Sequence, residues 1–223
     1  MTATPTEPHL AQAGLRQMFA EPRVRLVTRR FGVVSLVFLV LATALAGERV
    51  WLVPLGCAYG LAWWSFLEYL MHRFLLHWQP TSTRGQAICS RILLVPAHQA
   101  HHEEPMDAAG AVTTKHGLAL PVVLILFLSM LVVGFPLPFA LATMAGGSAG
   151  YLAYELAHYA CHQRRIRMTR YGKLLRRHHA IHHHVDEGTN FGVTSPVWDW
   201  VFRTYHRPGA RDARPLSDVH DNG

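Results

Sequence analysis

Residues 117–154 read GLALPVVLILFLSMLVVGFPLPFALATMAGGSAGYLAY, and these 38 residues contain no charged side chain. A bilayer core accommodates about 20 residues of helix, so the stretch is long enough for two spans. GFPLP, from Gly134 to Pro138, combines glycine with proline and indicates a turn between them. The stretch therefore predicts two antiparallel membrane helices.

Two further uncharged runs lie upstream, from Phe31 to Gly47 and from Val50 to Leu67. The first follows the basic segment Arg23–Arg30 and could be a signal peptide. We interpret it as a retained anchor because a second span follows directly. Buried helices of a large soluble core are a poorer explanation, because so short a chain leaves little to cover four apolar helices. We therefore predict an all-α integral membrane protein with four transmembrane helices.

The composition agrees with a membrane protein. Half of the 223 residues are hydrophobic and 16% are charged, whereas about a quarter are charged in soluble domains. Three cysteines without CxxC spacing (Cys57, Cys89 and Cys161) indicate reduced thiols, with no disulfide framework and no thiolate zinc site. The net charge of +7 comes mostly from arginines that flank apolar segments, and no aromatic-plus-basic pattern indicates nucleic acid.

The predicted organisation has one membrane-embedded domain between two tails. Residues 1–22 are polar and rich in Pro, Thr and Ala, which predicts a disordered N-terminal tail. Residues 23–205 form the membrane-embedded domain, and residues 206–223 are predicted to be a flexible C-terminal tail.

Histidines are concentrated in short clusters. The spacings are His-x4-His at residues 72–77, HxxHH at residues 98–102, HxxxH at residues 158–162, and five histidines within residues 178–184, where HxxHH recurs. Side chains three and four apart share a helix face, so HxxHH and HxxxH aim imidazoles in one direction. The x4 spacing of His72 and His77 does not fit a regular helix, and it predicts that the helix ends or distorts between them.

Topology places all four clusters on one membrane face, because two spans separate the second cluster from the third. Most of the positive charge lies on that face, while the opposite loops carry only Glu48, Arg49 and the uncharged GFPLP turn. The positive-inside rule therefore makes the histidine face, and both termini, cytosolic. The cations on that face are Arg23, Arg25, Arg29, Arg30, Arg164, Arg165, Arg167, Arg170, Lys173, Arg176 and Arg177.

Neutral imidazole is a ligand for iron, zinc or copper. One such ion accepts four to six ligands, and ten histidines exceed that number. Two metal ions that share the ten histidines are therefore the simpler interpretation. A bis-histidine haem protein would need paired histidines within the spans, and a metal transporter would place ionisable residues near mid-membrane; neither pattern is present. The sequence thus predicts a cytosolic, histidine-rich helical cap that holds a di-metal centre.

HRFLLH, HQAHH, HYACH and HHAIHH also resemble the histidine boxes of the fatty acid hydroxylase superfamily, which are integral membrane di-metal enzymes. The resemblance covers roughly residues 60–205 and is greatest to the fatty acid 2-hydroxylase branch. The chain departs from that branch at Glu155, where Asp is usual, at Ala157, where Thr is usual, and at Arg203, where Gly is common. The supporting context is EYLMHRFLLHW (68–78), HHEEPMD (101–107), GYLAYELAHYACH (150–162) and NFGVTSPVWDWVFRTY (190–205).

The resemblance implies an O2-dependent hydroxylase with two iron ions, which zinc could replace in purified protein. Such an enzyme inserts oxygen into a C–H bond of a lipid acyl chain taken from the bilayer, and 2-hydroxylation of a fatty acid or sphingolipid is expected. A carotenoid hydroxylase of the beta-carotene type and a sterol desaturase or hydroxylase are the alternatives. The short N-terminus leaves no room for a fused cytochrome b5 domain, so a separate donor of cytochrome b5 or ferredoxin type is expected. The membrane would be a bacterial inner membrane, or the endoplasmic reticulum of a eukaryote.

The resemblance also chooses among the five histidines of residues 178–184. It makes His179, His182 and His183 ligands, places His178 beside the ligands, and leaves His184 as a spectator. The implied metal ligands are His72, His77, His98, His101, His102, His158, His162, His179, His182 and His183.

Carboxylates commonly orient metal-bound imidazoles through their second N–H group. Glu155 precedes His158 by three residues and shares its helix face, so we assign it to the catalytic centre. Asp107 is assigned there too, or else it caps a helix after Pro105. Glu68 either orients a histidine or pairs with Arg73. Nearer the C-terminus, Trp198 and Trp200 predict an amphipathic segment that docks on the membrane or on the cap.

Overall fold

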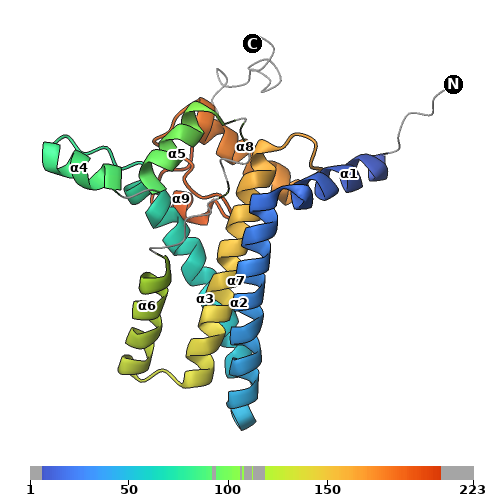
Figure 1. The fold of residues 1–223 in the computed structure, drawn as a ribbon, viewed down its shortest axis with the longest axis vertical. Helices are drawn as coiled ribbons and strands as arrows, with labels where there is room; N and C mark the ends of the chain where they lie inside the picture. The colour runs from blue at the N-terminus through green and yellow to red at the C-terminus, as the bar shows by residue number, and fades with distance from the viewer. Residues whose placement is uncertain (1–6, 92–93, 106, 108–111, 113–118, 207–223) are drawn as a thin grey trace.

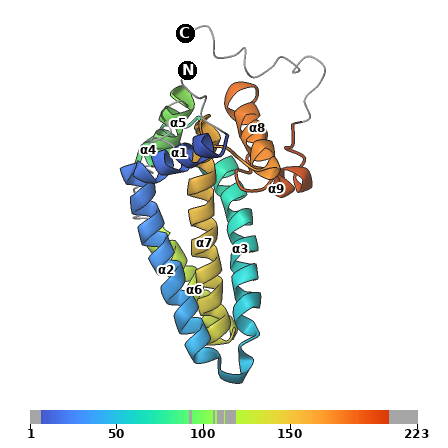
Figure 2. The same ribbon diagram turned by 90° about the vertical axis from the view of Figure 1, so that its right-hand side faces the viewer.

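The computed structural model describes residues 7–91, 94–105, 107, 112 and 119–206, and within these residues it contains helices and no strands (Figure 1). The all-α prediction is confirmed. Four helices occupy the places of the four predicted spans, and α2, α3 and α7 run side by side with α6 next to α7 (Figures 1 and 2). They are α2 (Pro22–Ala46), α3 (Leu52–Leu70), α6 (Ala119–Val133) and α7 (Leu137–His162), and a short 3-10 helix, η1 (Gly47–Arg49), joins α2 to α3.

One helix of the described chain, Pro22–Arg49, is long and apolar enough to cross a membrane by length and composition. The mean hydropathy of its most apolar 18 residues is 2.1, and only 11% of these residues are buried. A signal sequence would pass the same test, so four spans remain a prediction.

Glycines bring α3 and α7 into close contact. They are spaced four apart on both helices, as Gly56 and Gly60 on α3 and as Gly146 and Gly150 on α7. A Cβ added to Gly60 would lie 2.1 Å from the Thr143 carbonyl oxygen. Small residues at this spacing let membrane helices pack backbone against backbone. The two helices are therefore closely packed, and this packing positions the ends that carry His72 and His162.

Helix α1 (Glu7–Ala20) lies in the segment for which disorder was predicted, so for these residues the prediction was wrong. The helix turns away from α2 at the histidine-bearing end (Figure 1). Met18 is buried with Val24, Tyr159 and Ile166, and this tertiary packing orders a segment whose composition suggested a polar tail. The N-terminal residues 1–6 and most of the predicted C-terminal tail, residues 207–223, lie outside the described residues.

The remaining helices gather at the same end of the long helices (Figures 1 and 2). A π-helix, η2, continues α3 and contains His72, which confirms the predicted distortion between His72 and His77. α4 projects sideways (Figure 1), while α5 and α8 carry histidines of the second and fourth clusters. The bounds are η2 (Met71–Leu76), α4 (Thr83–Arg91), α5 (Leu94–Glu103), α8 (Arg170–His184) and α9 (Val197–Val201).

Arg176 fixes α8 against the end of α7. Its Nη2 atom donates to the carbonyl oxygens of Ala160, Gln163 and Ile166, at 2.8, 2.9 and 2.9 Å. Ala160 lies in the last turn of α7, where carbonyls lack intrahelical donors, and Gln163 and Ile166 follow in the connection to α8. Arg176 therefore has a structural role in addition to the topological one that the sequence suggested.

Candidate metal centre

The structure brings the ten predicted ligands together in two groups of five imidazoles. Within each group, one ring nitrogen from every member lies within 4.8 Å of those of the others. Group 1 consists of His72, His77, His98, His102 and His182, and group 2 consists of His101, His158, His162, His179 and His183. The two groups are adjacent, because the rings of His102 and His183 stack with centroids 4.0 Å apart.

In group 1 the Nε2 atoms converge. His77 Nε2 lies 3.0 Å from His182 Nε2 and 3.1 Å from His98 Nε2, and His98 Nε2 lies 3.1 Å from His102 Nε2. The π-helix makes this possible. His77 N donates to the His72 carbonyl at 3.3 Å, which closes an i to i+5 turn and brings residues five apart to one face.

Group 2 has the same geometry on other helices. His162 Nε2 lies 3.0 Å from His101 Nε2 and 2.9 Å from His179 Nε2. The α7–α8 junction held by Arg176 contributes four of the five rings, and α5 contributes His101. The two clusters on α7 and α8 thus meet because Arg176, in the middle of α8, holds that helix against the C-terminal end of α7.

Burial keeps the imidazoles of His101, His102, His179 and His182 electrically neutral near pH 7. Burial, followed by the charge of neighbouring His102, lowers the pKa of His101 to about 4. Burial also lowers the pKa of His102 to about 4 and holds those of His179 and His182 well below the usual value. A neutral imidazole has one N–H and one bare acceptor nitrogen. Two acceptor nitrogens about 3 Å apart repel each other unless a cation lies between them.

The donor set fits a metal ion in each group. For a metal–nitrogen bond of about 2.1 Å, two ligands at right angles stand about 3.0 Å apart, and the Nε2 separations are 2.9–3.1 Å. His72 Nε2 and both ring nitrogens of His183 are buried without a hydrogen-bond partner among the described residues. Buried polar atoms normally have partners, so these atoms favour ligands over a packed polar core.

Backbone carbonyls orient two of the group 1 rings. His72 Nδ1 donates to the Phe191 carbonyl at 2.5 Å, and His182 Nδ1 donates to the Thr189 carbonyl at 2.7 Å. Each contact places the proton on Nδ1 and leaves Nε2 able to bind a metal ion, as in the usual arrangement of metal-bound histidine.

Two buried carboxylates hold the segment that supplies these carbonyls. Glu68, 3% exposed, accepts from Val193 N at 2.6 Å and from the Thr194 backbone and hydroxyl at 2.8 and 2.5 Å. Arg73, the alternative partner in the sequence, instead donates to the Tyr69 hydroxyl at 2.7 Å.

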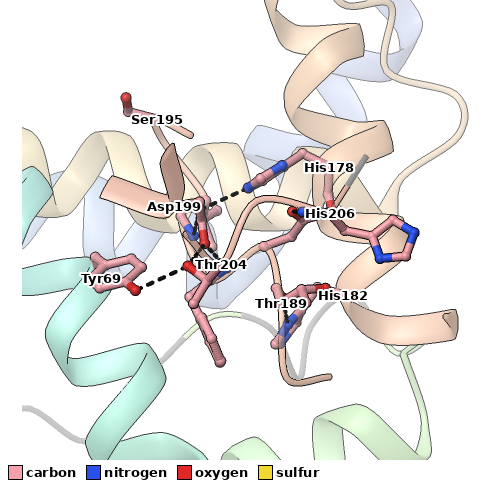
Figure 3. A network of polar contacts seen from close by, with 12 residues as sticks. Tyr69, His178, His182, Thr189, Ser195, Asp199, Thr204 and His206 are labelled. Atoms are coloured by element: carbon pink, nitrogen blue, oxygen red, sulfur yellow. Dashed lines mark hydrogen bonds and ion pairs between the residues drawn. The ribbon is translucent and has the colours of Figure 1, made fainter. Parts of the chain in front are cut away.

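Asp199, the second carboxylate, is fully buried. It lies at the centre of a polar network with His178 and Thr204 (Figure 3). Sequence reasoning missed Asp199 because the tryptophans on either side of it indicated a docking segment. Docking is indeed present, since Trp198 Nε1 donates to Ser65 Oγ on α3 at 3.2 Å.

The two predicted catalytic carboxylates have different surroundings. Glu155 is fully buried on α7 and accepts from the Tyr151 hydroxyl at 2.5 Å. Asp107 is exposed, its backbone N–H donates to the Glu104 carbonyl, and its charge acts on His101 to raise the pKa of that imidazole. Both lie near the histidine groups, and their catalytic roles remain predictions.

The two flanking histidines lie where the sequence predicted. His178 is buried next to His179 in the chain, with Nε2 3.0 Å from Asp199 Oδ2, and it belongs to neither group. His184 is exposed at the end of α8 and belongs to neither group.

Comparison with known proteins gives consistent matches. The family model described as fatty acid hydroxylase matches residues 57–204. The fatty acid 2-hydroxylase of Macaca fascicularis is 32% identical over 147 residues, which are 65% of this chain and 38% of that protein. The ceramide very long chain fatty acid hydroxylase SCS7 of Saccharomyces cerevisiae is 35% identical over 168 residues, which are 72% of this chain and 39% of that protein. The chain thus spans well under half the length of these relatives.

A plant relative and one solved structure extend the comparison. The dihydroceramide fatty acyl 2-hydroxylase FAH2 of Arabidopsis thaliana is 33% identical over 166 residues, which are 74% of this chain and 65% of that protein. A solved structure described as full-length scs7p, with only the hydroxylase domain visible, matches with a TM-score of 0.70 and 30% identity. The match covers 84% of this chain and 68% of that one.

Proposed function

This chain belongs to the fatty acid hydroxylase family, and on that premise we propose that it is a membrane-bound, di-iron hydroxylase. It uses O2 to insert oxygen at carbon 2 of a lipid acyl chain. The observation that carries the proposal is the pair of five-imidazole groups at one end of an apolar helix bundle. The named relatives, which act on fatty acids and ceramides, favour an acyl chain over the carotenoid and sterol alternatives.

Each histidine group holds one iron ion in this proposal. When bound, the two ions supply the activation of O2 and the oxidation of an unactivated C–H bond, which side chains alone cannot perform. One oxygen atom enters the C–H bond and the other leaves as water, with two electrons from a separate redox protein and two protons from solvent. Imidazole accepts zinc as well as iron, so purified protein can hold zinc.

The chain's own residues hold and orient the site. The carbonyls of Thr189 and Phe191 direct the Nε2 atoms of His182 and His72 inward. Glu155 and Asp107 supply negative charge beside the otherwise neutral ligands, and Tyr151 fixes the carboxylate of Glu155 through its hydroxyl. These groups set ligand direction and local charge before any substrate arrives.

Lipid surrounds the long helices in this proposal, and all four span the bilayer. Large apolar side chains are exposed along them, which in water would be unfavourable but in a bilayer is the stable arrangement. The arginine-rich end that carries the histidines is cytosolic by the positive-inside rule. Examples of the exposed apolar residues are Val33, Leu36, Val40 and Leu45 on α2, Leu55, Tyr59 and Leu61 on α3, and Ile125, Leu128 and Val132 on α6.

Lipid analysis of the source cells tests the function. Deleting the gene is expected to remove 2-hydroxy acyl chains from hydrolysed lipids, as measured by mass spectrometry. The wild-type gene restores them, and growth under 18O2 labels the hydroxyl. A His162→Ala gene, which lacks one group 2 ligand, does not restore them. Unchanged 2-hydroxy acyl chains in the deletion strain, or loss of oxygen from a carotenoid or sterol instead, would contradict the proposed substrate.

A further inference from the structure

Residues 189–194, which connect α8 to α9, form a loop that contacts group 1 through its backbone. The Thr189 carbonyl accepts from His182 Nδ1, and the Phe191 carbonyl accepts from His72 Nδ1. Both rings belong to group 1, although one lies on α8 and the other on η2. The loop therefore sets the direction of two of the five group 1 ligands at once.

Asp199 determines the path of this loop. Its Oδ1 accepts from Phe191 N at 2.9 Å and from Thr204 Oγ1 at 2.8 Å. Its Oδ2 accepts from Gly192 N at 2.9 Å and lies 3.0 Å from His178 Nε2. A carboxylate with no exposed surface is costly unless such donors surround it. These contacts hold the backbone on both sides of the carbonyl that orients His72.

Two residues of the loop, Asn190 and Gly192, allow its backbone to lie close to Asp199 and to the group 1 rings. A Cβ on Gly192 would lie 2.0 Å from the Ser195 carbonyl oxygen and 3.0 Å from Asp199 Oδ2, so a side chain there would push the loop away. Asn190 has φ of 57°, a left-handed conformation that asparagine tolerates better than most residues. Its amide donates to the His178 carbonyl at 3.3 Å and its Oδ1 accepts from His206 N at 2.8 Å, which fixes the turn.

Group 2 is held by different contacts. His162 is hydrogen-bonded to the Pro105 backbone, and Arg176 ties α8 to α7 independently of the loop. The N-terminus of α8 is capped by Thr169, whose hydroxyl accepts from Gly172 N at 3.1 Å. Removing Asp199 therefore releases the loop and the His178 ring, while the Arg176 contacts still hold the α7–α8 junction that forms most of group 2.

We propose that Asp199 is a positioning residue for the group 1 metal alone, acting through the 189–194 loop on His72 and His182. The inference rests on the proposed function, since it presupposes one metal in each group. Glu68 holds the other end of the loop but lies on the helix that leads into His72. Asp199 is the better position for a test than Glu68, because it lies on α9, which carries no histidine of either group.

Metal content of the full chain, purified in detergent, tests the proposal. Asp199→Ala is expected to weaken one of two metal sites 10–100-fold, the usual effect of losing a group that orients a ligand. At a free metal concentration that just saturates the wild-type protein, the metal content of the variant then falls from two ions per chain toward one. Asp199→Asn keeps the volume but turns an amide toward Gly192 N and His178, so it has the same direction of effect. Asp186→Asn, an exposed aspartate of the same connection, keeps both metals.

A double variant separates a local effect from general unfolding. His182→Ala already removes a group 1 ligand, so adding Asp199→Ala is expected to leave the remaining metal bound with unchanged affinity. Loss of that second metal in the double variant, or two wild-type affinities in Asp199→Ala, would overturn the proposal. A wild-type protein that binds fewer than two metals would instead contradict the proposed function.

Discussion

Replacing His182 with alanine is expected to lower hydroxylation more than a hundred-fold, and His179→Ala is expected to do the same from the other group. Losing a residue that merely orients a ligand costs 10–100-fold, and losing the ligand itself costs more. The ring of His182 is fully buried and that of His179 nearly so, so water reaches the vacated position poorly. The measurement is the rate of 2-hydroxy acyl formation in membranes supplied with the natural reductant.

Two controls sharpen this expectation. His184→Ala, at an exposed position on the same helix, keeps wild-type activity. The double variant His179→Ala/His182→Ala is expected to be no less active than either single variant, because residues that act as one unit are not additive in rate. If either single variant retained wild-type activity, that group would not be part of the catalytic centre.

Gly146→Ala is expected to destabilise the protein by about 3 kcal/mol, the upper end of the usual cost of overpacking. The added Cβ would lie 2.1 Å from the Cys57 carbonyl oxygen on α3. That obstacle is backbone, so no side-chain rotation relieves the clash and the α3–α7 pair must separate. Thermal unfolding in detergent, followed by far-UV circular dichroism, measures the effect.

Gly147 provides the matched control. It is the next residue on the same helix, and the nearest atom to its added Cβ is the Gly60 carbonyl oxygen at 3.8 Å, an ordinary contact. Gly147→Ala is expected to be neutral or slightly stabilising, because alanine is the better helix former. Equal melting temperatures for the two variants would show that α3 and α7 do not pack as described.

The candidate ligands could be predicted from spacing together with the family resemblance, but their division into two groups could not. Within HQAHH, His98 and His102 belong to group 1, whereas His101 belongs to group 2. In the α8 cluster, likewise, His182 belongs to group 1 and His179 belongs to group 2. Helix spacing shows which rings can share a face, yet here α5 and α8 each contribute rings to both groups. Which ring serves which group depends on how the helices are placed, and that is tertiary information.

The carboxylates were harder to predict for a related reason. Asp199 bonds to backbone N–H groups seven and eight residues earlier, in a loop without periodicity. Glu68 was expected to orient a histidine or to pair with Arg73, but it accepts from Val193 and Thr194, which are 125 and 126 residues away. Both carboxylates accept from backbone N–H groups in addition to side chains, and no residue type marks a backbone contact in the sequence.

The number of metal ions bound per chain tests the central claim most directly. The full chain, purified in detergent and loaded anaerobically with Fe(II), is analysed by elemental mass spectrometry against protein concentration from amino-acid analysis. Two groups of five converging imidazoles predict saturation at two ions per chain. Saturation at one ion, or at none, would contradict the di-metal centre.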